Sequence, residues 1–590
     1  MFTQELRSLI YLFISVRGSD GIWMVNGPPT LGSRPDFTGE TSSKTKVVVF
    51  GSDGALIAWC NGESVKVYKT SDYQQLWDLP HAKVFCMKFS PKGSILLIWE
   101  NYSVNPETQK GNANLHIYNM QTGKLLKSLI QKKQANWDPV WTNDEGICCR
   151  NVNNELHFFE NNDFDSIKTK LHMQKVSSFA LAVSGPPYYV AGYVPGSKGQ
   201  PSFIRLYKYP NFGGQGAAIA NRSFYKAEDV KMLWNNAGTA LLALTSTELS
   251  DQSYYGDQGL HYMNINGDAC LVPRSKNGPI YNIAWSPKST EFCVVYGFMP
   301  AKATLYNMKT EPIFDFGTGP RNSCFYNPQG NILCLAGFGN LRGNLEFWDV
   351  KQKRMITQTQ SPDTTSFEWC PDGEHILTST CSPRLRVANG YRVWHYTGTL
   401  LQQVLLEQNH ELWETAWQPA PKGAYPERPI RYGVVQAPVD VPQPDVKQKA
   451  YRPPQARGTE ASVKLHEYEA ASDPTKKLNP GHTGEESKAA SKNRKKREAR
   501  KAKSAQEDGQ AETEATASVP GGPSLSDLGR PQLTGDPEVD KKIKNLNKKL
   551  SAIQKLKEQQ QAGKPLEKNQ LDKLKTEESL LKELKDLKIT

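Results

Sequence analysis

Short runs of alternating apolar and polar residues recur along the first 436 residues, at intervals of about 40 to 50 residues. Each copy has an apolar segment ending near an aromatic residue, a turn rich in Pro, Gly and Asp, and a second apolar segment, as in FCMKFSPKGSILLIW from Phe85. Alternation with a period of two predicts β-strands joined by hairpin turns. The residues that end the first segments are Phe50, Phe89, Trp141, Trp234, Trp285, Tyr326, Trp369 and Trp417, with a degenerate copy near Val183.

A third predicted strand with an aromatic residue near its end follows each copy, as in LHIYNM from Leu115, and a weaker fourth strand usually comes next. Four short strands per repeat are typical of a blade of a WD40-like β-propeller. We therefore predict an all-β fold, a single nine-bladed propeller over residues 1–436. LIYLFISV from Leu9 and GIWMVN from Gly21 are predicted to complete a blade shared by both termini, and PIRYGVV from Pro429 to add one more strand.

Aromatic and charged residues divide the chain near residue 440. All 13 Trp lie at or before Trp417, and beyond residue 440 the aromatic residues are Tyr451 and Tyr468. Residues 441–590 hold 31 of the 72 Lys and Arg and 23 of the 60 Asp and Glu, which gives them +8 of the net charge of +12. Such a segment cannot build an ordinary core. It is either an arm that binds polyanions such as RNA or a solvated lysine-rich tail without a specific partner.

Recognisable motifs of catalysis and metal binding are missing. The 10 Cys form no C-x-x-C pair, no His/Cys cluster has zinc spacing, and there is no P-loop, G-x-S-x-G, kinase or deaminase signature. The glycine-rich stretch GFGNLRG from Gly337 has the wrong spacing for a phosphate-binding loop. No apolar run approaches the roughly 18 residues of a membrane span. We expect a cytoplasmic protein that is not an enzyme, with no metal, no cofactor and no membrane partner.

Enlarged connections between the second and third strands of several blades are expected to emerge on one face of the propeller, where insertions commonly build binding surfaces. Basic residues there would lie beside Tyr254, Tyr255 and Phe338, which suits RNA because guanidinium groups pair with phosphates and rings stack on bases. Ordinary solvated loops are the alternative. The basic residues of this face are Lys198, Lys302, Arg342, Arg384 and Arg386.

The tail is predicted to have two parts, a disordered proline-rich and basic linker over 437–535 and a C-terminal helical hairpin or coiled coil over 536–590. In the hairpin, apolar residues recur at helical spacing after Asp536, and Gly563 and Pro565 end the first helix. Two lysine-rich runs are candidates for RNA contact or for a protein partner, and an import signal is a further alternative for the first run, Ser491 to Lys503. Their basic residues are Lys492, Arg494, Lys495, Lys496, Arg497, Arg500, Lys501, Lys503, Lys541, Lys542, Lys544, Lys548 and Lys549.

Several stretches, in this order and over nearly the whole chain, resemble the eukaryotic translation initiation factor 2A family. They include YVPGSKGQPSFIRLYKYPNF, YGFMPAKATLYN, AGFGNLRGNLEFWDV, FEWCPDGEHILT, AYRPPQARG and GDPEVDKKIKNLNKKL. The propeller is also similar to that of the b subunit of initiation factor 3, a nine-bladed ring on the small ribosomal subunit. That similarity agrees with the single ring inferred from the repeats.

The resemblance implies a non-catalytic factor that binds initiator methionyl-tRNA and the small ribosomal subunit without using GTP. It further implies that the propeller binds tRNA and the ribosome, and that the tail binds mRNA and initiation factor 5B. By position, the run from Ser491 to Lys503 would match the factor 5B segment and the terminal hairpin the mRNA segment. The competing hypothesis is a ribosome-associated WD-repeat scaffold that holds polypeptides and makes no direct contact with tRNA.

Overall fold

The computed structural model describes residues 12–443 and Ile553, except residues 35–36, 38, 42–43, 198–199, 214–215, 226, 248–255, 437 and 439–440. The chain divides into two compact units, residues 1–472 and 473–590. Apart from Ile553, the described residues lie in the first unit. The predicted linker beyond residue 443 and, apart from Ile553, the predicted C-terminal hairpin lie outside the described residues, as do all thirteen candidate RNA-binding residues of the tail.

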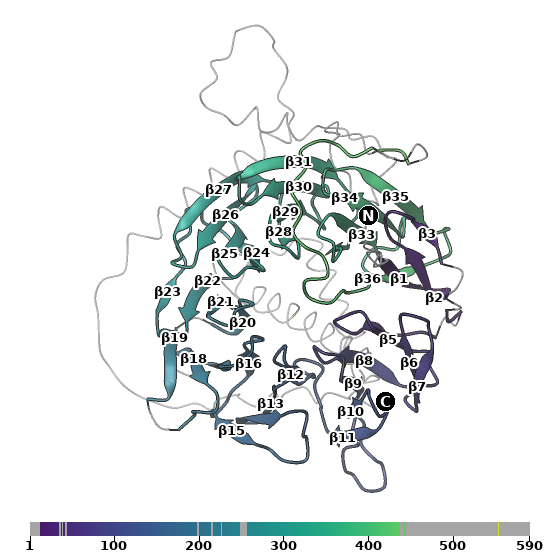
Figure 1. Ribbon diagram of the computed structural model, residues 1–590. Helices are drawn as coiled ribbons and strands as arrows, with labels where there is room; N and C mark the ends of the chain where they lie inside the picture. Colours follow the sequence, from purple (N-terminus) through teal and green to yellow (C-terminus); the bar gives the residue numbers. More distant parts are fainter. Residues whose placement is uncertain are drawn as a thin grey trace, which may run out of the picture. The chain divides into compact units, whose positions relative to one another are not determined.

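Nine four-stranded antiparallel sheets form the described part of the chain, arranged around a ring as the blades of a β-propeller (Figure 1). This confirms the predicted nine-bladed fold. The innermost strands of blades 1 to 9 are β4 (Val48–Phe50), β8 (Val84–Phe89), β12 (Val140–Trp141), β16 (Ser178–Leu181), β20 (Asp229–Trp234), β24 (Ile280–Trp285), β28 (Ser323–Tyr326), β32 (Ser366–Trp369) and β36 (Leu412–Trp417). Eight of these strands end at the aromatic residue that the repeat pattern predicted, and β16 ends two residues before Val183.

The second and third strands carry the most continuous apolar runs, because the neighbouring blades cover both of their faces. The second strands of blades 1 to 9 are β5 (Leu56–Cys60), β9 (Ile95–Glu100), β13 (Ile147–Val152), β17 (Tyr189–Val194), β21 (Ala240–Ser246), β25 (Glu291–Tyr296), β29 (Ile332–Gly337), β33 (His375–Thr380) and β1 (Phe13–Gly18). The third strands, in the same order, are β6 (Val65–Lys69), β10 (Leu115–Asn119), β14 (Glu155–Glu160), β18 (Ser202–Lys208), β22 (Gln258–Asn264), β26 (Ala301–Asn307), β30 (Asn344–Asp349), β34 (Gly390–His395) and β2 (Gly21–Asn26).

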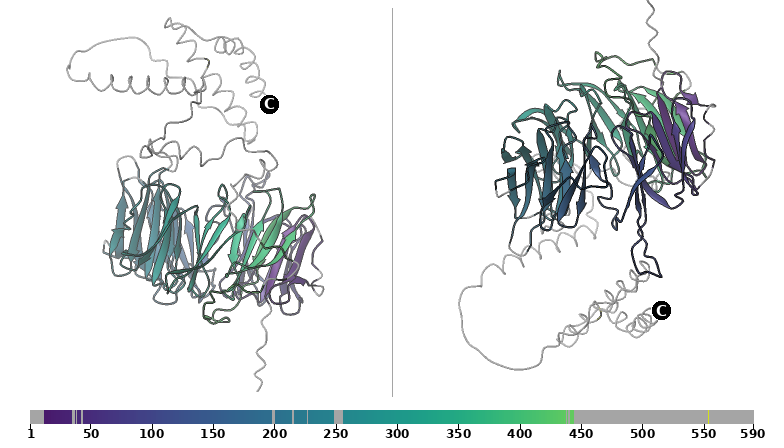
Figure 2. Two further views of the ribbon diagram at one scale, coloured as in Figure 1. Left: turned by 90° about the horizontal axis from the view of Figure 1, so that it is seen from above. Right: turned by 60° about the horizontal axis from the view of Figure 1, so that its bottom comes forward.

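The outermost strands are more polar, because one edge of each faces solvent. For blades 1 to 9 they are β7 (Gln75–Leu79), β11 (Leu125–Leu129), β15 (Thr169–His172), β19 (Ala218–Phe224), β23 (Ala269–Leu271), β27 (Pro312–Gly319), β31 (Arg354–Gln360), β35 (Leu400–Leu405) and β3 (Gly32–Ser33). Figure 2 shows the ring from two further directions, with the sheets standing side by side.

Both ends of the described ring contribute to blade 9, whose strand order is β3-β2-β1-β36. The last strand of the propeller pairs with the first, and Ile14 lies opposite Trp417 in the antiparallel register. Apolar clusters seal this blade on both sides: Ile14 and Trp417 pack with Val393 of blade 8, and Met24 packs with Ile57 of blade 1. The prediction of a blade shared between both termini is confirmed.

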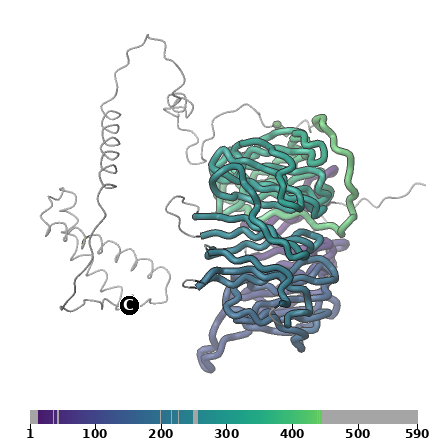
Figure 3. The backbone as a smooth tube through the Cα atoms, turned by 90° about the vertical axis from the view of Figure 1, so that its left-hand side faces the viewer, coloured from purple at the N-terminus to yellow at the C-terminus, as the bar shows by residue number. Residues whose placement is uncertain are grey.

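The predicted strand from Pro429 is wrong. Residues 418–436 form no strand, and this segment runs over one side of the ring, where Figure 3 shows it in bright green. Blade 9 already receives three strands from the N-terminal part of the chain, so no edge is left for PIRYGVV to complete. The segment bonds instead to loops of blades 7 and 8, and it extends as far as Gln443, whose amide is paired with both the N–H and the carbonyl of Leu400 (2.9 and 2.8 Å).

Candidate nucleic-acid interface

Two kinds of connection leave every blade at the same end of its strands. Because the strands are antiparallel, the connection from the second to the third strand and the connection to the next blade emerge on one side of the ring, which we call the loop face. The other two hairpin turns emerge on the opposite side, which we call the turn face. The loops that follow Val194, Tyr296, Gly337 and Thr380 all join second to third strands, so they share the loop face as predicted.

Arg342, Arg384 and Arg386 lie in such loops of blades 7 and 8 and form what we call the arginine cluster. Arg384 and Arg386 are exposed, and Arg342 is half-buried. The two loops adjoin, because a Cβ built on Gly339 in the blade 7 loop would lie 3.4 Å from Nη2 of Arg384 in the blade 8 loop. The structure therefore brings into contact the two loops that carry these three arginines, which the sequence had placed only on the same face.

Hydrogen bonds within the protein hold the blade 8 loop in place. The side-chain amide of Asn389 donates to the carbonyl of Leu385 (2.7 Å), and its oxygen accepts from the N–H of Leu412 (3.1 Å). The N–H of Ser382 donates to the carbonyl of Leu412 (2.7 Å). Because these loop backbone groups are paired inside the protein, the loop is fixed against strand β36 while Arg384 and Arg386 remain exposed to solvent.

The charge of the arginine cluster is only partly neutralised. Nε of Arg386 lies 3.7 Å from Oε1 of Glu411, and both side chains are largely exposed, so this ion pair is weak. A hydrogen bond from the Trp413 indole lowers the pKa of Glu411, which keeps it ionised. Among the described residues, Arg342 and Arg384 form no ion pair. The cluster is therefore a positive patch on the loop face.

Lys302, predicted to belong to the same surface, is held by partners within the protein. It lies on β26, and its Nζ contacts Oδ2 of Asp315 (2.7 Å) and donates to Oγ of Ser275 (2.8 Å). The hydrogen bond with Asp315 raises the pKa of Lys302. Only 20% of its side chain is exposed. Lys302 therefore belongs to the polar contacts between blades 5 and 6, and it is not part of the arginine cluster.

The expected aromatic partners are placed differently from the prediction. Phe338 is half-buried and packs against Phe325 and Phe367, with ring centroids 6.3 and 6.2 Å apart, at the edge of the apolar cluster between blades 7 and 8. Tyr254, Tyr255 and Lys198 lie outside the described residues. Exposed rings on the loop face come from Tyr225, which is 89% exposed, and Phe298, which is 52% exposed. Neither ring was among the aromatic residues predicted for this face. The sequence feature that could have identified them is an aromatic residue in a connection between two strands.

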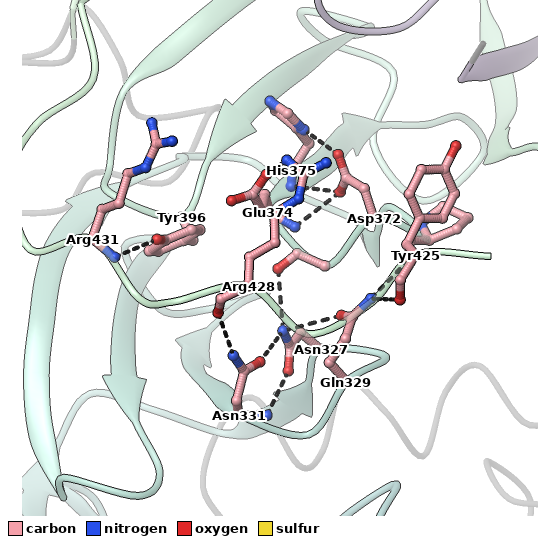
Figure 4. A network of polar contacts seen from close by, with 12 residues as sticks. Asn327, Gln329, Asn331, Asp372, Glu374, His375, Tyr396, Tyr425, Arg428 and Arg431 are labelled. Atoms are coloured by element: carbon pink, nitrogen blue, oxygen red, sulfur yellow. Dashed lines mark hydrogen bonds and ion pairs between the residues drawn. The ribbon is translucent and has the colours of Figure 1, made fainter. Parts of the chain in front are cut away.

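The turn face of blades 6 to 8 is covered by the C-terminal segment of the propeller unit (Figure 4). Arg428 forms an ion pair with Glu374 (2.5 Å), and Tyr396 accepts a hydrogen bond from the N–H of Arg431 (2.7 Å). Further bonds join Gln329 and Asn331 to Tyr425 and Arg428, Lys288 to Glu427, and Asp349 to Tyr432. Among the described residues, this segment occupies the turn face of blades 6 to 8, whereas the arginine cluster lies on the loop face.

Few described residues could hold a metal ion. The group with metal-ligand spacing in the described part of the chain is His81, Glu100 and His116, between blades 1 and 2. The glycine-rich stretch from Gly337 is a loop between β29 and β30, as predicted. Within the described ranges, no helix is long and apolar enough to cross a membrane.

Comparisons with known proteins agree with this architecture. The family model of eukaryotic translation initiation factor eIF2A matches residues 222–415, and the model of the C-terminal domain of the same family matches residues 541–587. Eukaryotic translation initiation factor 2A of Drosophila melanogaster is 37% identical over 94% of both chains. The b subunit of initiation factor 3 from Xenopus laevis is 23% identical over 62% of this chain and 53% of its own. A crystal structure of a eukaryotic initiation factor is 31% identical, with a TM-score of 0.64, over 70% of this chain and all of its own.

The fold and these relatives define the class of the protein as a β-propeller translation initiation factor. The level of identity to the Drosophila protein, over nearly the whole of both chains, settles the family. The chain belongs to the eukaryotic translation initiation factor 2A family.

Proposed function

We propose that the chain is a non-catalytic cytoplasmic initiation factor that binds initiator methionyl-tRNA and the small ribosomal subunit without using GTP. In this proposal the loop face of the propeller contacts RNA, and the basic tail contacts mRNA and other initiation factors, including factor 5B. The observation that carries the proposal is the arginine cluster, in which Arg342, Arg384 and Arg386 project from two adjoining loops.

The chemistry of the cluster suits folded RNA. A guanidinium group forms paired hydrogen bonds with phosphate oxygens, and it keeps its charge at every physiological pH. Double-stranded RNA is recognised mainly through its phosphates, its 2′-hydroxyl groups and its shape, so a rigid array of cations fits a tRNA better than a base-reading groove would. The hydrogen bonds of Asn389 supply that rigidity for the blade 8 loop.

The tail has a different role in this proposal. The family's C-terminal domain matches residues 541–587, which include Lys541, Lys542, Lys544, Lys548 and Lys549. A lysine-rich segment binds RNA through many phosphate contacts with little sequence preference. When it is tethered to a propeller docked on the ribosome, its effective concentration near mRNA is set by the length of the linker. The propeller would supply position, and the tail would supply additional affinity.

Charge reversal tests the arginine cluster in the full chain. The variant Arg342→Glu, Arg384→Glu, Arg386→Glu is compared with the control Lys124→Glu, Lys309→Glu, Lys351→Glu, which makes the same change of charge at exposed turns of the opposite face. We expect the cluster variant to bind labelled initiator methionyl-tRNA and small subunits at least tenfold more weakly, and the control to match the wild type within about twofold. Circular dichroism and thermal melting verify that both variants keep the fold.

The outcome also separates the proposal from a protein-interaction scaffold. Equal losses in both variants would mean that net charge alone drives binding, and unchanged binding in the cluster variant would overturn the assignment of this surface. If both variants bind ribosomes as the wild type does, and no propeller-dependent tRNA binding exists, the scaffold is the better account.

A further inference from the structure

Three side chains with metal-binding chemistry meet at the loop face between blades 1 and 2. His81 lies in the connection from β7 to β8, Glu100 ends β9, and His116 lies on β10. Each residue offers one ligand atom, and these atoms all lie within 4.8 Å of one another. Nothing in the sequence spacing of these residues indicated a metal site. They meet because β9 and β10 pair side by side while the blade connection folds back over their ends.

The spacing of the first two ligands already fits a metal ion. Nδ1 of His81 lies 3.2 Å from Oε1 of Glu100. Tetrahedral zinc with bonds of about 2.0 to 2.1 Å holds its ligand atoms roughly 3.3 Å apart. The His116 ring stacks near the His81 ring, with centroids 4.3 Å apart. The ligand atom of His116 lies within 4.8 Å of those of His81 and Glu100.

Neighbouring hydroxyl groups orient both imidazole rings. Nε2 of His81 is hydrogen-bonded to the Tyr118 hydroxyl (2.8 Å), and Nδ1 of His116 is hydrogen-bonded to Oγ of Ser128 (2.9 Å). Histidines that bind metals typically use the second ring nitrogen in such a hydrogen bond, which fixes the tautomer and the ring plane. These hydroxyl groups engage Nε2 of His81 and Nδ1 of His116. Nδ1 of His81, which is paired with Glu100, and Nε2 of His116 are the ring nitrogens left to bind the ion.

The site is sheltered but reachable from solvent. The His81 side chain is 11% exposed and that of Glu100 is 24% exposed, while Tyr118 is buried beneath them. Partial exposure of this kind allows an ion to enter and a water molecule to remain on it. Two imidazoles and one carboxylate with an open fourth position are a ligand set that Zn²⁺ accepts readily.

We propose that His81, Glu100 and His116 bind one divalent transition-metal ion, with Zn²⁺ as the best match, that ties the blade 1–2 connection to blade 2. The unfolded chain separates these residues along the sequence, so the ion binds the folded propeller in preference and stabilises it. The bound ion would also add a positive charge to the loop face.

Metal binding is measured directly on the full chain after chelator treatment. Zn²⁺ is titrated against a chromophoric chelator for the wild type, Glu100→Gln and His116→Gln, with His157→Gln as the matched control because His157 is also paired with a glutamate, Glu155 (2.8 Å). We expect one equivalent to bind to the wild type and to the control. Each site variant is expected to lose at least tenfold in affinity.

A Co²⁺ titration of the wild type gives a second readout that needs no variant to fold. Visible absorption bands of a four- or five-coordinate Co²⁺ without a thiolate charge-transfer band are expected, since the ligands are nitrogen and oxygen. The proposal is overturned if no stoichiometric binding occurs, if both site variants bind as tightly as the wild type, or if the spectrum shows thiolate ligation by one of the ten cysteines.

Discussion

Arg17 and Glu414 lie 397 positions apart in the sequence, yet Nε of the first is 3.1 Å from Oε2 of the second. They sit on β1 and β36, the paired strands through which the beginning and the end of the propeller meet. Glu414 is 46% exposed, so this ion pair contributes little, about 1 kcal/mol or less. The closure is stabilised instead by the apolar contacts beneath the pair, among which Ile14 and Trp417 are fully buried.

Substitutions in blade 9 test whether the apolar contacts or the ion pair stabilise the closure of the ring. We expect Ile14→Ala to lower the free energy of unfolding by about 2 to 4 kcal/mol, because it leaves a cavity between blades 8 and 9. Arg17→Ala is expected to change it by about 1 kcal/mol or less. Denaturant melts of the full chain measure both values. A larger cost for Arg17→Ala than for Ile14→Ala would contradict the account of the closure.

Glu368 gives the propeller a pH dependence. It lies on the innermost strand β32, where burial raises its pKa to about 7, against a hydrogen bond from the Trp417 N–H (3.0 Å) that favours ionisation. The folded state therefore holds a proton that the unfolded chain releases near pH 4.3. Stability from this group is complete below about pH 4 and is lost as the pH rises through 7, by roughly 3 kcal/mol in total.

The variant Glu368→Gln keeps an acceptor for Trp417 and carries no charge. We expect it to melt at a higher temperature than the wild type at pH 8, and the difference to shrink toward pH 5. Thermal melts at intervals of half a pH unit show this directly. A difference that stays constant from pH 5 to pH 8 would show that Glu368 does not titrate in this range.

Lys302 and Arg384 provide a matched pair of single substitutions. Because Asp315 and Ser275 already hold Lys302, we expect Lys302→Gln to leave the affinity for initiator tRNA within about twofold of the wild type. Arg384→Gln is expected to weaken binding and to reduce the salt slope by about one, the loss of one phosphate contact. Filter binding across a salt series distinguishes the two. A larger loss of affinity for Lys302→Gln than for Arg384→Gln would show that Lys302 contacts the RNA.

Deletion of residues 444–590 tests the tail as an arm for RNA. The truncation point follows Gln443, so the bonds of Gln443 to blade 8 are kept. The deleted segment contains both lysine-rich runs, and we expect binding to unstructured RNA to weaken and to depend less steeply on salt, since fewer phosphates are neutralised. If the truncated chain keeps the full salt slope, the tail does not bind RNA in this way.

Most of the fold could be predicted because the signal repeats. The same local pattern recurs in each blade: an alternating strand that ends at an aromatic residue, such as Trp285 or Trp369, before a turn rich in Pro, Gly and Asp. Nine copies of this pattern predict nine sheets. The path of residues 418–443 could not be predicted in this way, because Arg428 and Tyr432 find their partners, Glu374 and Asp349, in blades 8 and 7. PIRYGVV has the composition of a strand, but no free sheet edge was available to it.

The candidate site was predictable only as a list of residues on one face. The loops of Arg342 and Arg384 lie on the same side of the ring, because both join the second to the third strand of an antiparallel blade. Whether each side chain is available to a ligand depends on its contacts in the folded chain: Lys302 on β26 pairs with Asp315 on β27, and Phe338 packs against Phe367 of blade 8. No local pattern in the sequence reports such pairings.

The central claim is that the propeller itself binds initiator tRNA. The direct measurement compares the binding of labelled initiator and elongator methionyl-tRNA to the full chain, to residues 1–443 and to residues 444–590, across a salt series. We predict that residues 1–443 bind initiator tRNA in preference to elongator tRNA. Binding confined to residues 444–590, and equal for both tRNAs, would contradict the account and leave a ribosome-associated scaffold in its place.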